Sequence, residues 1–167
     1  VLLGFLTTLL WGESTPYVLV GAGFLFIGSG AAFAMTPASR ALTESTPIRR
    51  VGMASATSDL QRDLGGSIMQ ALLGAVLAAG FAASFARQIA ASAEAQSVSA
   101  EVTQALQASY ASALRVAEQY PQYATQITQG ATQSLLDGAF FAYLIGAVAI
   151  VVGATVVAIF LPGFARE

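Results

Sequence analysis

The sequence predicts an all-α, polytopic membrane helix bundle with about four transmembrane helices, and three observations support this prediction. Hydrophobic residues make up 56 % of the 167-residue chain and charged residues only 10 %, whereas soluble domains carry about 25 % charged residues. Several charge-free stretches approach the roughly 20 residues that a helix needs to cross a bilayer. Cysteine and histidine are both absent, which excludes disulfides and the commonest general base. We therefore expect a membrane protein that is not an enzyme and has no metal or cofactor.

Four apolar segments are expected to be the spans, at about residues 1–11, 17–38, 56–85 and 137–161. The first segment is too short to cross a bilayer alone. It also opens at Val1 without the basic region that begins a signal peptide. We therefore expect the chain to be a fragment whose upstream part completes this span. The fourth span is expected to stop at Pro162–Gly163.

The segment at about 87–134 is rich in Ala, Gln and Ser and is expected to be a long helical loop. Four apolar side chains recur every four residues, as one helix with an apolar stripe would place them: Val102, Leu106, Tyr110 and Leu114. Ser99 is the expected N-cap of this helix, and the sequence from Tyr120 to Tyr123 is expected to end it. The loop is either a solvated hairpin resting on the protein or the lipid headgroups, or a lid over a pathway.

Arginine is unevenly distributed between the two main loops. The segment at about 40–62 contains four arginines close to the ends of spans, whereas 87–134 contains two. Basic residues near span ends favour the cytoplasmic side. We therefore expect the loop 40–62 and the C-terminus, with Arg166, to be cytoplasmic and the loop 87–134 to be extracytoplasmic. The net charge of −2 gives no support to nucleic-acid binding.

Three charged residues crowd the expected start of the third span. Asp59 and Arg62 are three residues apart and Asp59 and Asp63 are four apart, so all three share one face of a helix. Two interpretations are open. The cluster is either a cap at the helix start, where the helix dipole stabilises an anion, or a switchable ionic contact with another part of a larger protein.

Small and polar residues inside the spans suggest packing positions and a cavity. Glycines let helix backbones approach closely in lipid, and Gly65, Gly66, Gly146 and Gly153 are the candidates for helix packing or hinges. Gln70 is a polar group in a membrane helix, and such a group usually faces a bundle interior or a cavity. With Gln70, the candidate cavity-lining residues are Met69, Phe24 and Phe33, because Met and aromatic side chains suit varied apolar ligands.

The stretch SDLQRDLGGSIMQALLGAVLAAGF resembles the penultimate span of major-facilitator efflux proteins with fourteen spans, the QacA/EmrB-type drug:proton antiporters. The preceding GSGAAFAMTPASRALTESTPIRRVGMASA is similar to the twelfth span of that family and the inner loop after it. The stretch YPQYATQITQGATQSLLDGAFFAY is most similar to the actinobacterial EfpA-like efflux proteins. The resemblance extends over nearly the whole chain.

This resemblance implies spans eleven to fourteen of a partial major-facilitator fold in a bacterial inner (plasma) membrane. It implies efflux of amphipathic drugs or similar small molecules by alternating access, proton-coupled in the full-length protein, with the coupling residues upstream of Val1. The implied partners are the bilayer, the substrate and the missing N-terminal half. Asp59, Arg62 and Asp63 would form the C-terminal side of the inner gate. Two alternatives remain: an exporter of lipids or lipid-linked molecules with the same fold, and a membrane scaffold or subunit that transports nothing.

Overall fold

The computed structural model describes residues 1–12, 14–92 and 98–160, and these contain helices joined by turns, with no strand among them. The all-α prediction is therefore confirmed. The elements are α1 (Leu2–Thr8), α2 (Tyr17–Glu44), the 3₁₀ turn η1 (Ile48–Arg50), α3 (Val51–Ala91), α4 (Ala100–Ala108), α5 (Tyr110–Gln119), the 3₁₀ turn η2 (Pro121–Tyr123) and α6 (Ala124–Phe160).

Three segments of the described chain are long and apolar enough to cross a membrane: Tyr17–Arg40, Ile48–Ala91 and Pro121–Ile159. They coincide with the second, third and fourth predicted spans. The first predicted span forms only the seven-residue α1. Seven residues rise about 10 Å in a helix, about a third of the hydrocarbon thickness of a bilayer, so α1 does not span by itself.

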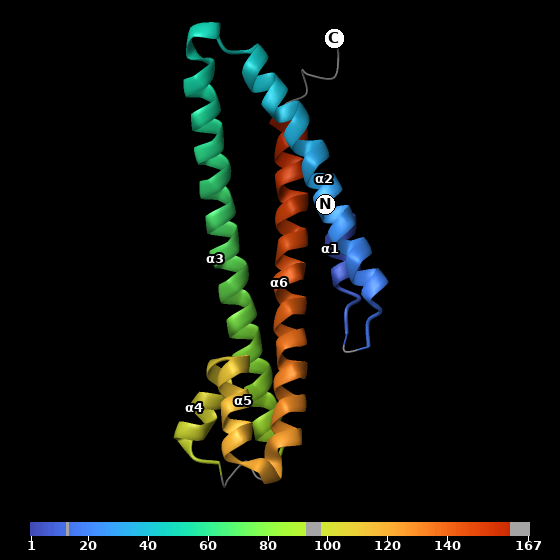
Figure 1. Cartoon of the computed structure of the whole chain (residues 1–167), viewed down its shortest axis with the longest axis vertical. Coiled ribbons are helices and arrows are strands. Elements are labelled where there is room, and N and C mark those ends of the chain that lie inside the picture. The colour runs from blue at the N-terminus through green and yellow to red at the C-terminus, as the bar shows by residue number, and fades with distance from the viewer. Residues whose placement is uncertain (13, 93–97, 161–167) are drawn as a thin grey trace. The chain divides into compact units, whose positions relative to one another are not determined.

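The chain divides into two compact units. The first half of α3 and the second half of α6 belong to unit 1, and the other halves of these helices belong to unit 2. Unit 1 comprises residues 1–72 and the chain from Leu144 onward. In unit 1, α1 lies alongside α2 (Figure 1). Glycines bring these two helices close, because a Cβ on Gly23 would lie 2.9 Å from Thr7 Oγ1 and a Cβ on Gly4 would collide with Ile27.

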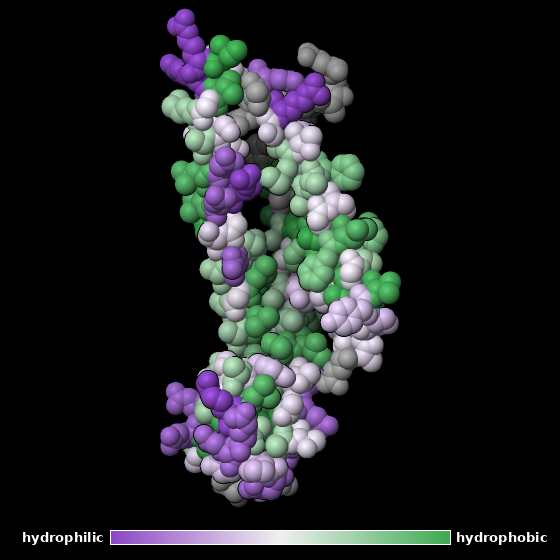
Figure 2. Space-filling view, in the orientation of Figure 1, coloured by the Kyte–Doolittle hydropathy of each residue, from purple (hydrophilic) through white to green (hydrophobic). Residues whose placement is uncertain are grey.

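Unit 2 comprises residues 73–143, in which α4 and α5 pack beside the second half of α3 and the first half of α6 (Figure 1). Its core contains buried side chains from all four helices: Phe81, Phe85, Leu106, Ala113, Val116 and Ala131. Hydrophilic residues gather on the outer surface over α4 and α5 (Figure 2). The part of unit 2 that α4 and α5 form therefore has an apolar inside and a polar outside.

The prediction of one helix carrying the stripe from Val102 to Leu114 is wrong. Helix α4 ends at Ala108, and Ser109 is extended, with φ −171° and ψ 162°. The Ser109 hydroxyl accepts a hydrogen bond from the Ser112 backbone N–H at 3.1 Å and so caps α5. A serine side chain that bonds to the local backbone competes with a continuous helix. The predicted cap at Ser99 is confirmed, because its Oγ accepts from the Val102 N–H at 3.3 Å.

Two helices extend beyond the predicted spans that they contain. The third span is predicted at 56–85, and α3 runs from Val51 to Ala91. The fourth span is predicted to begin at residue 137, and α6 runs without interruption from Ala124. The predicted break at Tyr120 to Tyr123 is confirmed, because η2 lies there. Polar residues with good helix propensity extend each helix beyond its apolar part, so apolarity marks the span and not the helix ends. The expected stop at Pro162–Gly163, and Arg166, lie outside the described residues.

Candidate functional site

The charged cluster of α3 forms as the spacing predicts. Nη2 of Arg62 lies 3.0 Å from Oδ1 of Asp59, and Nε of Arg62 lies 3.7 Å from Oδ1 of Asp63. All three side chains are more than half exposed. Arg62 thus joins two carboxylates on one helix face, and this face is open to a further partner.

The interpretation of this cluster as a cap at the helix start is wrong. Helix α3 begins at Val51, so Asp59 lies more than two turns inside it. The favourable effect of a helix dipole on an anion is confined to the first turn. The cluster is therefore held by its own ion pairs, and the switchable contact with another part of a larger protein stays a prediction.

A groove of unit 1 brings the end of α2 beside this cluster. Its volume is about 890 Å³, and its charged lining residues are Asp59 and Arg62 of α3 with Arg40 and Glu44 of α2. Arg40 Nε lies 2.8 Å from Glu44 Oε1. Exposed ion pairs of this kind contribute about 0–1 kcal/mol. Since so little free energy holds each pair, either arginine can exchange its carboxylate partner at small cost.

Of the four glycines predicted to allow helix packing, one lies in a close contact between helices. A Cβ on Gly146 would collide with the ring of Phe5 in unit 1, so this glycine does allow close packing. At Gly65, Gly66 and Gly153 a Cβ would meet no atom of the described chain within 4 Å. For these three the predicted packing is not found among the described residues.

The four predicted cavity residues line neither the groove of unit 1 nor the pocket of unit 2 described below. Phe24 packs its ring against Trp11, with ring centroids 5.5 Å apart, and is 62 % exposed. Phe33 and Gln70 are exposed and Met69 is half-buried. Phe24, Phe33 and Gln70 therefore lie on exposed helix surfaces, and the assignment of all four residues to a cavity stays a prediction.

A polar network in unit 2 joins α3 to α6, and sequence reasoning missed it. The buried Ser84 Oγ donates to Asp137 Oδ2 at 2.5 Å, and Gln133 Nε2 donates to Asp137 Oδ1 at 3.1 Å. One turn further along α3, Gln88 Nε2 donates to Ser134 Oγ at 2.9 Å and to the Gly130 carbonyl at 3.3 Å. All of these residues belong to apolar helices long enough to cross a membrane, where an unpaired polar group is costly.

Two glycines allow the helices to approach at this network. A Cβ on Gly80 would lie 2.8 Å from the Gly138 Cα, and a Cβ on Gly138 would lie 2.6 Å from the Leu77 carbonyl oxygen. Real Cβ atoms do not approach backbone atoms so closely. Glycine at both positions is therefore a condition for the short Ser84–Asp137 hydrogen bond.

The network has a sequence signal that apolar runs do not show. Asp137 stands at the predicted start of the fourth span. Yet Gly80, Ser84 and Gln88 recur every four residues in an otherwise apolar stretch, which places them on one helix face. A stripe of small and polar residues of this kind is typical of a helix–helix contact in lipid.

Comparisons with known protein families, curated proteins and solved structures found no match for this chain. The likeness to major-facilitator transporters therefore stands on the sequence motifs alone. The described residues support the coarser conclusion of a helical membrane protein, because three of their helices are long and apolar enough to cross a bilayer.

Proposed function

We propose that this chain is the C-terminal part of a secondary active efflux transporter of the major-facilitator type, which exports amphipathic small molecules by alternating access. Three apolar helices of sufficient length support a polytopic membrane protein. The motifs around the third span support the family. Side chains that would be buried in a bundle are exposed in the described chain, including Phe33 (80 %) and Leu25 (70 %), which agrees with further helices packing on these faces or with lipid contact.

The cluster of Asp59, Arg62 and Asp63 is the observation that carries this proposal. It lies well inside a helix and not at its end, it is exposed, and it borders a charged groove. A transporter of this kind needs ionic contacts that form in one conformation and break in the other. Weak, exposed ion pairs satisfy this need, because they can be replaced by pairs to another part of the protein.

Transport by the complete protein with Arg62→Ala tests the proposal. A contact of about 1.4 kcal/mol that exists in one state only shifts the ratio of inward-open to outward-open states about tenfold when it is removed. We expect efflux to fall while expression and membrane insertion stay normal, and Asp63→Asn to behave similarly. Arg115→Ala, which removes an exposed arginine of α5 outside this cluster, is the matched control. Unchanged transport, together with an unchanged spin-label distance across the cytoplasmic opening of the proposed pathway, would contradict the switchable contact. That result would show that the cluster is a purely local set of ion pairs.

The proposed location is a bacterial plasma membrane, with the loop 40–62 cytoplasmic and the loop 87–134 extracytoplasmic. The arrangement of arginines supports this orientation. Substrates are proposed only as a class, small amphipathic molecules, and an exporter of lipid-like molecules shares every feature above. Efflux assays with a cationic dye and with a fluorescent lipid distinguish the two.

A further inference from the structure

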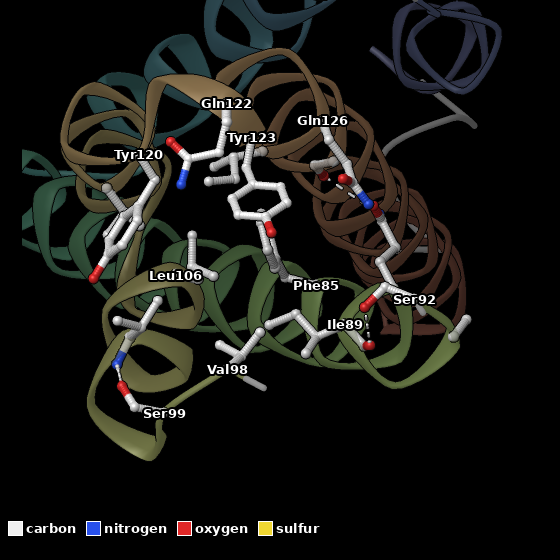
Figure 3. A pocket seen from close by; sticks show the side chains of 16 residues that line it. Phe85, Ile89, Ser92, Val98, Ser99, Leu106, Tyr120, Gln122, Tyr123 and Gln126 are labelled. Atoms are coloured by element: carbon white, nitrogen blue, oxygen red, sulfur yellow. Dashed lines mark hydrogen bonds between the residues drawn. The ribbon is translucent and has the colours of Figure 1, made fainter. Parts of the chain in front are cut away.

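Unit 2 contains a pocket that neither the predicted transport pathway nor the ionic cluster explains. It has a volume of about 720 Å³ and lies between α3, α4, α5 and the start of α6 (Figure 3). Pockets that bind small molecules are typically about 300–1,000 Å³ and largely apolar, with a few polar groups that orient the ligand. This pocket therefore has the size of a ligand site.

The inner part of the pocket is apolar and belongs to the rigid core of unit 2. Phe85, Leu106 and Val116 line it, and each is at most 6 % exposed. Because these side chains pack against one another from three different helices, this part of the pocket is preformed. A ligand that enters it does not have to order the surrounding chain, which lowers the cost of binding.

The polar side chains that line the pocket among the described residues are all uncharged. Gln122, Tyr123 and Gln126 line one side, and Tyr123 directs its ring into the space above Phe85 (Figure 3). Their amide and phenol groups can donate and accept hydrogen bonds. No Asp, Glu or Arg side chain of the described residues lines the pocket. A charged ligand would lose its hydration here without gaining a counter-ion from the described lining residues, and such a loss is costly.

The pocket lies near the ends of two helices that are long and apolar enough to cross a membrane, because its lining residues include Ala91 and Tyr123. Tyr120 and Tyr123 each combine an apolar ring with a polar hydroxyl group, which suits an amphipathic ligand.

We propose that the pocket of unit 2 binds an uncharged amphipathic molecule, with its apolar body against Phe85, Leu106 and Val116 and its hydroxyl or carbonyl groups at Gln122, Tyr123 and Gln126. Monoacylglycerols and neutral glycosides belong to this chemical class. The proposal uses the geometry of unit 2 alone and does not rest on the transport function proposed above.

Photolabelling of the 167-residue chain in lipid nanodiscs tests this proposal. The probe is a long-chain monoacylglycerol carrying a diazirine, and mass spectrometry assigns the labelled residues. We expect labels on residues 85–92 and 120–130 that unlabelled monoacylglycerol competes away. A fatty acid probe of the same chain length, which is anionic, should label these residues about tenfold less, equivalent to about 1.4 kcal/mol.

A blocking variant and its control make the result specific. Val98 lines the pocket from a segment outside the helices, so Val98→Trp should fill the space and reduce labelling about tenfold. Ala111→Trp introduces the same ring on the exposed side of α5, away from the pocket, and should leave labelling unchanged. A short-chain, water-soluble probe shows whether the ligand enters from water, and the long-chain probe whether it enters from the bilayer.

Three of the outcomes that overturn the proposal are measured on the unaltered chain and do not depend on the fold of the variant. In the unaltered chain, labels confined to other segments, labels that do not saturate, or equal labelling by the anionic probe would each refute it. Labelling of residues 85–92 that persists in a folded Val98→Trp chain, checked by circular dichroism, would also refute it. Loss of transport in the complete protein has no bearing on this test, so the two proposals fail independently.

Discussion

Replacing Gly138 by alanine should open the contact between α3 and α6 in unit 2. The added Cβ would lie 2.6 Å from the Leu77 carbonyl oxygen and 2.9 Å from the Phe81 backbone nitrogen. Both are backbone atoms, so no side-chain rotation can relieve the overlap. The two helices must separate, and separation breaks the Ser84–Asp137 and Gln88–Ser134 hydrogen bonds that cross between them.

The expected cost follows from three contributions. Overpacking of a close contact costs about 1–3 kcal/mol, and each hydrogen bond lost between membrane helices costs about 0.6 kcal/mol on average. Alanine is a better helix former than glycine by about 1 kcal/mol, which offsets part of this loss. We therefore expect Gly138→Ala to lower the free energy of unfolding by about 1–3 kcal/mol.

Gly74→Ala is the matched control, because a Cβ on Gly74 meets nothing within 4 Å and only the gain in helix propensity remains. Unfolding by dodecyl sulfate in mixed micelles, followed by circular dichroism, measures the stability of both variants. Spin labels on cysteines at Ala79 and Phe140, in a chain without native cysteine, report the spacing of the two helices. Equal stabilities for the two variants, with an unchanged spin-label distance in Gly138→Ala, would refute the close approach of α3 and α6.

Three further predictions test other parts of the structure. Ser84→Ala removes the buried hydroxyl that donates to Asp137 and should cost about 0.6–1.7 kcal/mol, whereas Ser67→Ala, which removes a bond to its own helix backbone, should cost less in the same unfolding assay. Ser99→Ala removes the cap of α4 and should cost about 1 kcal/mol, visible as faster hydrogen exchange confined to α4; protection equal to that of the unaltered chain would contradict the cap. A cysteine at Ser45 should be protected from an impermeant thiol reagent in intact cells and one at Ser112 should react, and the opposite pattern would reverse the proposed orientation.

The sequence was most informative where one physical property decides the structure. Long apolar runs located the second, third and fourth spans, because bilayer thickness sets a minimum length that few soluble helices meet. The helix cap at Ser99 and the ion pairs of Arg62 were also predictable, because both depend on partners three or four residues away. For these two features, the spacing of residues along the sequence was sufficient to predict the contact.

Features that depend on distant partners were not predictable in the same way. Ser84 and Asp137 are 53 residues apart in the chain, and neither residue by itself indicates that they meet. The break at Ser109 was missed because the apolar stripe continues across it, while a serine cap redirects the backbone. The pocket of unit 2 combines residues of four helices, so no single periodicity reveals it.

The contacts between α3 and α6 in unit 2 follow a regular order that explains why this unit is compact. Along α3, Gly80, Ser84 and Gln88 follow at intervals of four residues, and their partners on α6 run in the opposite direction, from Gly138 and Asp137 to Ser134 and Gly130. The glycines set the distance and the hydrogen bonds set the register. Because a slip by one residue would remove the hydrogen bond that Ser84 donates to Asp137, and polar groups in apolar helices are costly to leave without partners, these contacts favour a single arrangement. The pocket lies directly beyond them, at Gln88 and Gly130, so its shape depends on the same register.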